Sequence, residues 1–240
     1  MRSISAVIPA FNEEDAIAGT VAGVARALAD LGADFEVVVV DDGSRDNTAA
    51  VVHGLREQLP MVRLVSHSVN RGYGAALGTG FAAAANDLLF LTDGDTQFDP
   101  REVARLLPLL DHADLAIGYR KPRADPWQRR FFGWGWNTII NALFGYTARD
   151  VDCAFKLFPR ALLAELNVIS TAHTFSPELI VKARRAGYRV AEVRVTHLPR
   201  AAGVAKGSRP DAIVRSLYQL LHLRLALAQK RKRAPVRNAP

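Results

Sequence analysis

The chain has 240 residues, of which 49% are hydrophobic and 23% are charged, a composition that excludes disordered and fibrous proteins and suffices to bury one large core. Its single cysteine, Cys153, excludes an internal disulfide framework and indicates a reducing compartment. The sequence contains neither a signal-peptide pattern nor an uninterrupted apolar window of about eighteen residues. We therefore expect a cytoplasmic protein without a transmembrane segment.

Basic charge is concentrated at the C-terminal end of the chain. The formal net charge is +7, and residues 230–240 carry five cations and no acid, which leaves +2 for the remainder. Such a tail is either attracted to an anionic membrane surface, at about 1 kcal/mol per cation, or is a solvated and disordered end. A nucleic-acid role would rest on the tail alone, so we expect no nucleic-acid partner.

The first half of the chain alternates short apolar runs with amphipathic stretches. The runs expected to form strands are residues 5–10, 35–40, 62–67, 88–92 and 115–119. This alternation predicts βαβ units and a parallel sheet, and the almost wholly apolar run at 35–40 is typical of a central strand covered on both faces. Ligands of open parallel sheets bind beyond the carboxyl ends of the strands, so the residues after each run are the candidates for a site.

Two carboxylates follow the fourth run, in the segment Asp93-Gly94-Asp95-Thr96-Gln97. Mg²⁺ prefers oxygen ligands and commonly takes one or two carboxylates together with phosphate oxygens of its substrate. A metal site completed by a bound diphosphate is therefore one interpretation. The alternative is a turn whose aspartates cap a helix that begins near Pro100.

The second half begins with a loop rich in proline and arginine at 121–126 and continues with an aromatic, helical segment at 127–145. Strands are expected at 155–158 and 188–195, and helices at 159–166, 177–186 and about 211–229, the last of them amphipathic. Aromatic side chains beside arginines favour contact with a membrane surface over a purely core-facing helix. We expect one domain at 1–208, the amphipathic helix at 209–229 and a disordered basic tail at 230–240.

Taken together, the polar segments after the strands resemble the inverting family-two glycosyltransferases of the GT-A fold. The resemblance covers residues 4 to about 207 and is carried by segments 9–14, 41–48, 70–74 and 92–100. Within that family, Asp150-Val151-Asp152-Cys153-Ala154-Phe155-Lys156-Leu157-Phe158 is similar to a segment of the polyprenyl-phosphate hexosyltransferases, such as dolichol-phosphate mannose and glucose synthases. The resemblance implies an α/β, Rossmann-like fold with a mostly parallel sheet covered by helices on both faces.

The resemblance also implies a site for a nucleotide diphosphate sugar such as GDP-mannose or UDP-glucose. Asp93, Asp95 and Gln97 would hold Mg²⁺ or Mn²⁺, with Asp95 the direct ligand. The other residues implied for the donor are Pro9, Asn12, Glu13, Asp41, Asp42, Arg71, Gly72, Arg200 and Lys206. Three of these positions also have structural interpretations: Asp42 as a helix cap, together with Ser44, and Arg200 and Lys206 as a solvated basic loop.

For the acceptor, the resemblance assigns a phosphate to Arg120 and Arg129, with Arg123 or Arg130 as substitutes. Gly133 departs from the pattern, because relatives often carry a small hydroxyl residue there, and puts that contact in doubt. The catalytic residues implied are Asp150, as a base or as a group that orients the acceptor, Asp152 as its alternative, and Asp95. Glu178 lies where other branches place their base, although a first-turn glutamate also stabilises a helix.

A phosphate acceptor changes what the carboxylate has to do. An alcohol needs its proton removed, whereas a phosphate monoester has a second pKa near 6 and is already largely anionic at neutral pH. Asp150 would then position the acceptor, and the arginines would matter more. We expect transfer of a hexose to a polyprenyl phosphate at the cytoplasmic face of a membrane. The alternatives are a hydroxyl-bearing or other soluble acceptor, and a non-catalytic module that binds nucleotides or lipid phosphates.

Overall fold

The computed structural model describes residues 2–168, 170, 174–200 and 210–233. Its seven strands are β1 Ser3–Ala10, β2 Asp34–Asp41, β3 Val62–Ser66, β4 Leu88–Leu91, β5 Leu115–Arg123, β6 Lys156–Pro159 and β7 Val190–His197. Its α-helices are α1 Ile17–Asp30, α2 Thr48–Gln58, α3 Tyr73–Ala83, α4 Val103–Leu106, α5 Trp127–Phe144, α6 Arg160–Leu166, α7 Phe175–Arg185 and α8 Pro210–Arg233. Two 3₁₀ turns, Pro100–Glu102 and Leu107–Asp111, flank α4. Each strand predicted from the sequence is present.

The strands form one sheet in the order β3-β2-β1-β4-β6-β5-β7. Neighbouring strands are parallel except around β6, which runs antiparallel to both β4 and β5. The predicted mostly parallel α/β fold is therefore confirmed. In the register of β1 and β2, Pro9 pairs with Val40 and Ala10 with Asp41. The polar segments after these strands consequently leave the sheet at the same edge, as expected for a parallel pair.

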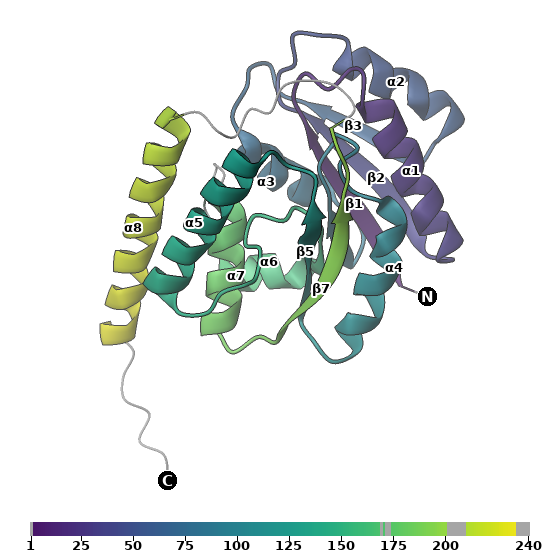
Figure 1. The fold of residues 1–240 in the computed structure, drawn as a ribbon. Helices are drawn as coiled ribbons and strands as arrows, with labels where there is room; N and C mark the ends of the chain where they lie inside the picture. The colour runs from purple at the N-terminus through teal and green to yellow at the C-terminus, as the bar shows by residue number, and fades with distance from the viewer. Residues whose placement is uncertain (1, 169, 171–173, 201–209, 234–240) are drawn as a thin grey trace.

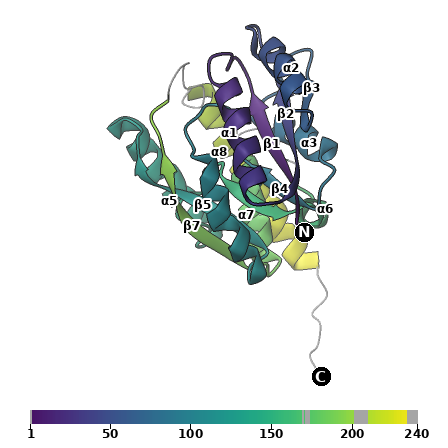
Figure 2. The same ribbon diagram turned by 90° about the vertical axis from the view of Figure 1, so that its right-hand side faces the viewer.

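Helices cover both faces of the sheet, and the alternation of side chains along the strands divides the core between them. On β1, Ile4, Ala6 and Ile8 pack with α1, α2 and α4, whereas Val7 packs on the opposite face. That second face is covered by α3, α5, α6 and α7, and by Leu220 of α8. Figure 1 shows α1 and α2 at one side of the molecule and α5 with neighbouring α8 at the other, and Figure 2 views the molecule from the side of α1 and α2.

The outer surface of α5 is unusually aromatic. Trp127, Phe131, Phe132 and Trp134 are each at least 60% exposed, and on neighbouring α8 Tyr218, Leu221 and Leu225 are exposed as well. Scattered exposed apolar residues are ordinary, whereas these four large aromatic side chains are gathered on one helix. Among the helices of the described ranges, none is both long and apolar enough to cross a membrane.

Candidate active site

The carboxylates after β4 are not used to cap the following helix. Asp99 accepts the hydrogen bond from the backbone nitrogen of Arg101 and so caps the turn Pro100–Glu102. The alternative in which Asp93 and Asp95 cap this helix is therefore wrong. Thr96, between Asp95 and Gln97, has a φ of 59°, a left-handed conformation that is costly for a β-branched residue and is typical of functional loops.

Asp93 and Asp95 lie close enough to affect each other's ionisation. Burial, followed by the charge of Asp95, raises the pKa of Asp93 to about 7. The hydroxyl of Tyr73, at the start of α3, donates to Oδ1 of Asp93 at 3.1 Å. Asp95 is 7% exposed, and its Oδ1 accepts from the backbone nitrogen of Gln97 at 3.1 Å. Two neighbouring carboxylates disfavour each other's charged form, which is why the pKa of Asp93 is raised.

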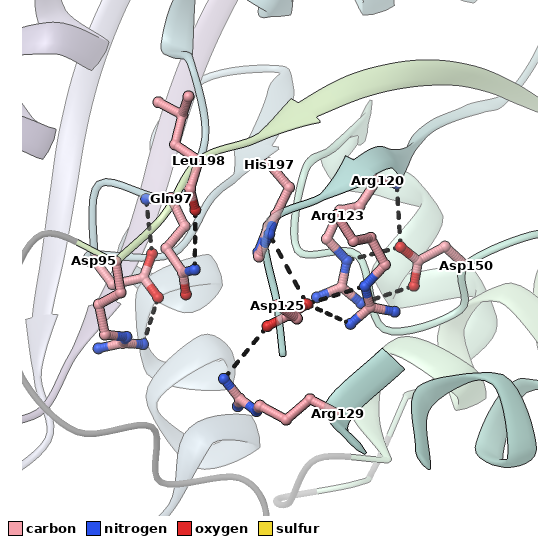
Figure 3. Close-up of polar contacts among 10 residues, drawn as sticks. Asp95, Gln97, Arg120, Arg123, Asp125, Arg129, Asp150, His197 and Leu198 are labelled. Atoms are coloured by element: carbon pink, nitrogen blue, oxygen red, sulfur yellow. Dashed lines mark hydrogen bonds and ion pairs between the residues drawn. The ribbon is translucent and has the colours of Figure 1, made fainter. Parts of the chain in front are cut away.

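A cation from the chain itself lies between two acidic groups of this site. Arg200, just after β7, brings Nη2 to 2.5 Å from Oδ2 of Asp95 and Nη1 to 3.3 Å from both carboxylate oxygens of Glu13. Its buried Nε has no hydrogen-bond partner. The loop is also tied to β7 through Gln97, whose amide nitrogen donates to the carbonyl of Leu198 (Figure 3). Arg200 thus reaches the carboxylates, whereas Lys206 lies outside the described residues.

The carboxylates of Asp93 and Asp95 fit a divalent cation that takes only some of its ligands from the protein. No three His, Cys, Asp or Glu side chains among the described residues gather in a metal-binding arrangement. The pair Asp93 and Asp95 supplies two carboxylates, and Mg²⁺ commonly takes one or two carboxylates with the remaining positions filled by phosphate oxygens and water. In this structure Arg200 occupies Oδ2 of Asp95, so a cation bound there would compete with its guanidinium.

Several residues predicted to contact the nucleotide brace the loops around it. Both oxygens of Asp42 are engaged: Oδ1 lies 2.6 Å from Nδ1 of His67 and accepts from the backbone nitrogen of Arg71, while Oδ2 accepts from that of Gly72. Gly72 has a φ of 95°, which favours glycine, and precedes α3. The side chain of Arg71 is exposed. Asp42 therefore fixes the backbone that leads into α3.

The loops after β1 and β2 are joined in the same way. The side chain of Asn12 accepts a hydrogen bond from the backbone nitrogen of Arg45, and the backbone N–H of Asn12 donates to Oγ of Ser44. Asp41 accepts from the backbone nitrogen of Ser44 at 3.0 Å. The helix cap expected at Asp42 or Ser44 is wrong, because Asp46 accepts from the backbone nitrogen of Thr48, at the start of α2. Pro9 is buried on β1, beneath these loops.

A second cluster lies at the end of β5. Arg120 holds Asp150 with two side-chain hydrogen bonds, Nε to Oδ2 at 2.7 Å and Nη2 to Oδ1 at 2.8 Å, and its backbone nitrogen also donates to Oδ2 (Figure 3). Burial by itself raises the pKa of Asp150, but the hydrogen bonds and charge of Arg120 outweigh it and lower that pKa to about 2. Asp150 is therefore a fixed anion and a weak base.

Asp152 differs from Asp150 both in its contacts and in its pKa. Arg120 binds Asp150 instead, and burial of Asp152, against the charge of Arg120, raises its pKa to about 6. Beneath it, the fully buried Lys156 donates to the carbonyl of Cys153 and to Oγ of Ser176. Burial lowers the pKa of Lys156. Asp150 is thus a poor base near neutral pH, whereas Asp152 is a competent one.

Two residues of this cluster were missed from the sequence. Asp125 accepts from Nε and Nη2 of Arg123 at 3.0 and 2.8 Å, and from Nη1 of Arg129 at 3.4 Å. His197, the last residue of β7, brings Nδ1 to 3.9 Å from Asp125, and this buried nitrogen has no hydrogen-bond partner. A proline-flanked acid in a basic loop was the only signal for Asp125. Arg130 is exposed and outside the cluster.

Glu178, the possible base of other branches, is engaged elsewhere. It is 3% exposed on α7, pairs with Nζ of Lys182 at 2.5 Å and accepts from the backbone nitrogen of Ser170. These contacts agree with the structural interpretation of Glu178, in which a glutamate in the first turn stabilises its helix.

Comparison with known proteins identifies the scaffold on which these clusters are built. Residues 5–166 match the model of the family described as Glycosyl transferase family 2. The chain belongs to glycosyl transferase family 2. All of β1 to β4, and the carboxylates Asp93, Asp95, Asp150 and Asp152, lie within or at the edge of this matched range.

Curated family 2 relatives include two transferases named for polyprenyl phosphates. A dodecaprenyl-phosphate galacturonate synthase of Rhizobium johnstonii is 31% identical over 208 residues, covering 85% of this chain and 61% of the relative. An undecaprenyl-phosphate 4-deoxy-4-formamido-L-arabinose transferase of Edwardsiella ictaluri is 32% identical, with 85% and 62% covered. The chain therefore spans about three fifths of the length of these relatives.

Solved structures of other proteins share the fold. Glucosyl-3-phosphoglycerate synthase from Mycobacterium tuberculosis, in complex with Mn²⁺ and UDP-glucose, superposes with a TM-score of 0.70 at 24% identity, covering 93% of this chain and 79% of that one. A complex of the same enzyme that also contains glycerol 3-phosphate gives a TM-score of 0.70, again at 24% identity, with 93% and 80% covered. At this identity the likeness shows the fold alone.

Proposed function

We propose that this chain transfers a hexose from a nucleotide diphosphate sugar to a polyprenyl phosphate, with inversion at the anomeric carbon and with Mg²⁺ or Mn²⁺ at Asp93 and Asp95. The observation that carries the proposal is the two-point pairing of Arg120 with Asp150, which lowers the pKa of Asp150 to about 2. Such a carboxylate is unsuited to accept a proton from an alcohol near neutral pH. An acceptor that is already anionic needs no base.

The acceptor side of the site carries a surplus of positive charge. Arg120, Arg123 and Arg129 surround two carboxylates, Asp125 and Asp150. An arginine guanidinium presents a planar fork that matches phosphate geometry. A phosphate monoester would contact the arginines while Asp150 keeps Arg120 in place. The names of the two curated relatives, both polyprenyl-phosphate transferases, support this class of acceptor.

On the donor side, Asp93, Asp95 and Arg200 support a nucleoside diphosphate as the leaving group. The complexes of the fold neighbours with Mn²⁺ and UDP-glucose support a divalent cation. A divalent cation bound there supplies positive charge that stabilises the departing diphosphate. The acceptor oxygen forms a bond to the anomeric carbon as the bond to the diphosphate breaks, and the diphosphate leaves with the electron pair. Arg200 carries one unpaired N–H at this position and would stabilise the same charge.

A polyprenyl acceptor has to be met at a bilayer, and we propose that the chain binds the membrane surface peripherally through α5. Its exposed aromatic side chains stand next to Arg129 and Arg130 on the same helix. Aromatic and cationic residues together are typical of segments that lie in the membrane interface. The proposal includes the expectation that this surface is the cytoplasmic face of the membrane.

The proposal is tested by incubating the purified protein with a panel of radiolabelled nucleotide sugars, a polyprenyl phosphate and Mn²⁺, and then extracting lipid. We expect label in the organic phase with at least one donor, and its loss when EDTA replaces Mn²⁺. Absence of lipid product with every donor would contradict the proposal. Absence of donor hydrolysis as well would favour a non-catalytic binding module.

A hydroxyl acceptor is the second candidate, and Asp152 is the observation in its favour. A carboxylate whose pKa burial raises to about 6 has the properties of a general base. Substituting Asp152→Asn separates the two candidates. If the acceptor is an alcohol, the rate falls by about 10²-fold or more, the usual contribution of a general base; with a phosphate acceptor most of the rate is retained.

A further inference from the structure

The segment that joins α5 to β6 carries the carboxylates Asp150 and Asp152 and has no helix or strand of its own. Its middle is buried, with Thr147, Ala148 and Val151 each at most 2% exposed. Buried backbone N–H and C=O groups need hydrogen-bond partners, and a segment outside helices and strands has no regular ladder to supply them. Side chains of other elements therefore have to hold this segment.

Two asparagines of α5 supply partners for the middle of the segment. Oδ1 of Asn137 accepts from the backbone nitrogen of Val151 at 3.0 Å, and its Nδ2 donates to the carbonyl of Ala148 at 3.1 Å. Asn141, one turn further along α5, accepts from the backbone nitrogen of Thr147 at 2.8 Å and donates to the same carbonyl at 3.3 Å. Asparagine is unfavourable in the interior of a helix, because its side chain competes for backbone hydrogen bonds. These four contacts account for both asparagines.

Other elements hold the segment on either side of Asp150. The backbone nitrogen of Arg149 donates to Oε2 of Glu192 in β7 at 2.8 Å. The carbonyl of Cys153 accepts from Lys156, the first residue of β6. Between these two attachments, the contact comes from Asn137 of α5.

The hydrogen bond that Asn137 accepts fixes the peptide group next to the Asp150 side chain. The nitrogen of Val151 belongs to the peptide bond that joins Asp150 to Val151, and this group is planar and rigid. Asp150 in turn accepts from Nε and Nη2 of Arg120 at 2.7 and 2.8 Å. Such a two-point pair requires a defined orientation of the carboxylate, so a displacement of this peptide would weaken it.

The helix that carries Asn137 has little buried surface. Ile140 is the one buried residue among the 18 of α5, all of which the structure describes, and Trp136, Leu143 and Phe144 add partly buried contacts. Elements with few buried apolar contacts have low local stability. The opposite side of α5 carries the exposed aromatic side chains. One helix thus presents aromatic residues to the outside and asparagines to the segment with Asp150.

We propose that Asn137 is a positioning residue: from α5 it holds the peptide after Asp150 and so places this carboxylate where both of its oxygens bind Arg120. The inference rests on the proposed function, in which Asp150 keeps Arg120 in place for the acceptor phosphate, and adds to it the residue that places Asp150. The helix proposed to meet the membrane is then also the helix that positions the acceptor side of the site.

The test compares Asn137→Ala with Asn141→Ala as its matched control. Each replaces the same residue type in the same helix, removes two hydrogen bonds to the segment and leaves one backbone N–H without its partner. The two should therefore lower the stability of the fold to a similar extent. They differ in position, because Asn141 holds Thr147, three residues before Asp150. Each variant is combined with Asp150→Asn, and urea unfolding is measured for every combination.

In the wild type and in Asn141→Ala, we expect Asp150→Asn to lower the urea midpoint by the same amount. In Asn137→Ala it should lower the midpoint by at most about half as much, because the pairing with Arg120 is already weakened and the two substitutions are not additive. Asn137→Ser, a milder change at the same residue, provides the same comparison if the alanine variant is too unstable to purify.

The transfer assay provides a second measurement. Asn137→Ala should raise the KM for the acceptor at least about tenfold, the order expected for a lost hydrogen bond to a charged group, and leave the KM for the nucleotide sugar unchanged. Asn141→Ala should leave both KM values within about twofold of the wild type, since it does not contact the peptide next to Asp150.

An effect of Asp150→Asn that is equal in every background would overturn the inference, as would an equal rise in acceptor KM for Asn137→Ala and Asn141→Ala. A different result concerns the proposed function alone. If Asn137→Ala reduces the effect of Asp150→Asn on unfolding but no lipid product forms with any donor, the positioning of Asp150 stands and the transfer reaction does not.

Discussion

At the scale of single residues, the contrast between Asp150 and Asp152 decides how the acceptor is handled. The two side chains are two positions apart, but Arg120 binds both oxygens of Asp150 and neither of Asp152. Arg120 lowers the pKa of Asp150 to about 2, whereas burial, against the charge of Arg120, raises the pKa of Asp152 to about 6. One carboxylate is therefore a permanent partner for an arginine, and the other changes charge just below neutral pH.

The pairing of Asp150 predicts a pH-dependent loss of stability in Asp150→Asn. Its pKa in the folded state is about 2, below its ordinary value of 3.8, so the pairing stabilises the folded state above pH 4 and loses this effect as the pH falls towards 2. The substitution should lower the free energy of unfolding by about 2 kcal/mol at pH 7 and by about half as much at pH 3. Urea denaturation of both proteins at the two pH values measures this. An equal loss at both would show that ionisation is not the cause.

Arg200 predicts a change in metal affinity that is independent of catalysis. Its guanidinium lies 2.5 Å from Oδ2 of Asp95, so an incoming cation has to compete with it. Arg200→Gln should bind Mn²⁺ alone about tenfold more tightly, equivalent to about 1.4 kcal/mol. It should bind a nucleoside diphosphate with Mn²⁺ more weakly, because one cation for the phosphates is lost. The free Mn²⁺ signal in electron paramagnetic resonance measures both, and unchanged affinity for Mn²⁺ alone would exclude the competition.

The residues of the site could be predicted in part. Asp93, Asp95, Arg120 and Asp150 follow strand ends or a recognisable motif. Asp125 and His197 could not be found in this way, because what unites them is a contact between positions 72 residues apart. Asp42 was expected to contact a nucleotide, but the hydrogen bonds that hold its carboxylate to Arg71 and Gly72 depend on a loop conformation that no local pattern encodes.

At the scale of elements, apolar runs predicted the central strands β1, β2 and β4, because burial on both faces leaves little room for polar residues. The antiparallel direction of β6 and the shift in register between the ends of β5 and β7 were not predictable. Both depend on pairing with distant strands, and neither changes the local pattern of polar and apolar residues. The aromatic α5 was predicted as a helix, and its exposed face agrees with the expected membrane contact without testing it.

Helix α3 offers a matched pair of substitutions that tests how closely it packs on the sheet. A Cβ on Gly80 would lie 2.4 Å from Cγ1 of Val7 and 3.0 Å from Cγ2 of Val40, whereas one on Gly78 would meet nothing within 4 Å. We expect Gly80→Ala to destabilise the fold by about 1–3 kcal/mol through overpacking. Gly78→Ala should stabilise it by up to about 1 kcal/mol through helix propensity. Chemical denaturation distinguishes them, and equal effects would contradict the close packing.

The outer face of α5 predicts binding to lipid vesicles. Phe131 and Phe132 are 60% and 65% exposed, and Val69, on the loop before α3, is equally exposed at 65%. Phe131→Glu with Phe132→Glu should reduce cosedimentation with anionic vesicles by at least about tenfold, since burial of an aromatic side chain contributes roughly 1.5–3 kcal/mol. Val69→Glu should leave it unchanged. A similar loss in Val69→Glu would attribute binding to overall charge, and no loss in either would exclude α5.

At the scale of the whole molecule, one sheet edge presents two clusters of opposite character. Asp93 and Asp95 supply negative charge, which suits a cation, whereas the arginines at the end of β5 supply positive charge, which suits an anion. Gln97 and Leu198 join the loop of the first cluster to β7, and His197 of β7 faces the second. This arrangement supports a reaction in which two phosphate-bearing substrates meet.

The most direct test of that reaction offers the enzyme two acceptors of equal chain length, a polyprenyl phosphate and the corresponding polyprenol, with one labelled nucleotide sugar and Mn²⁺. The proposed function predicts that label enters the phosphate and not the alcohol, that Asp152→Asn retains most of this transfer, and that Arg120→Lys loses it. Transfer to the polyprenol at a comparable rate, abolished in Asp152→Asn, would contradict the proposal and favour base catalysis on a hydroxyl acceptor.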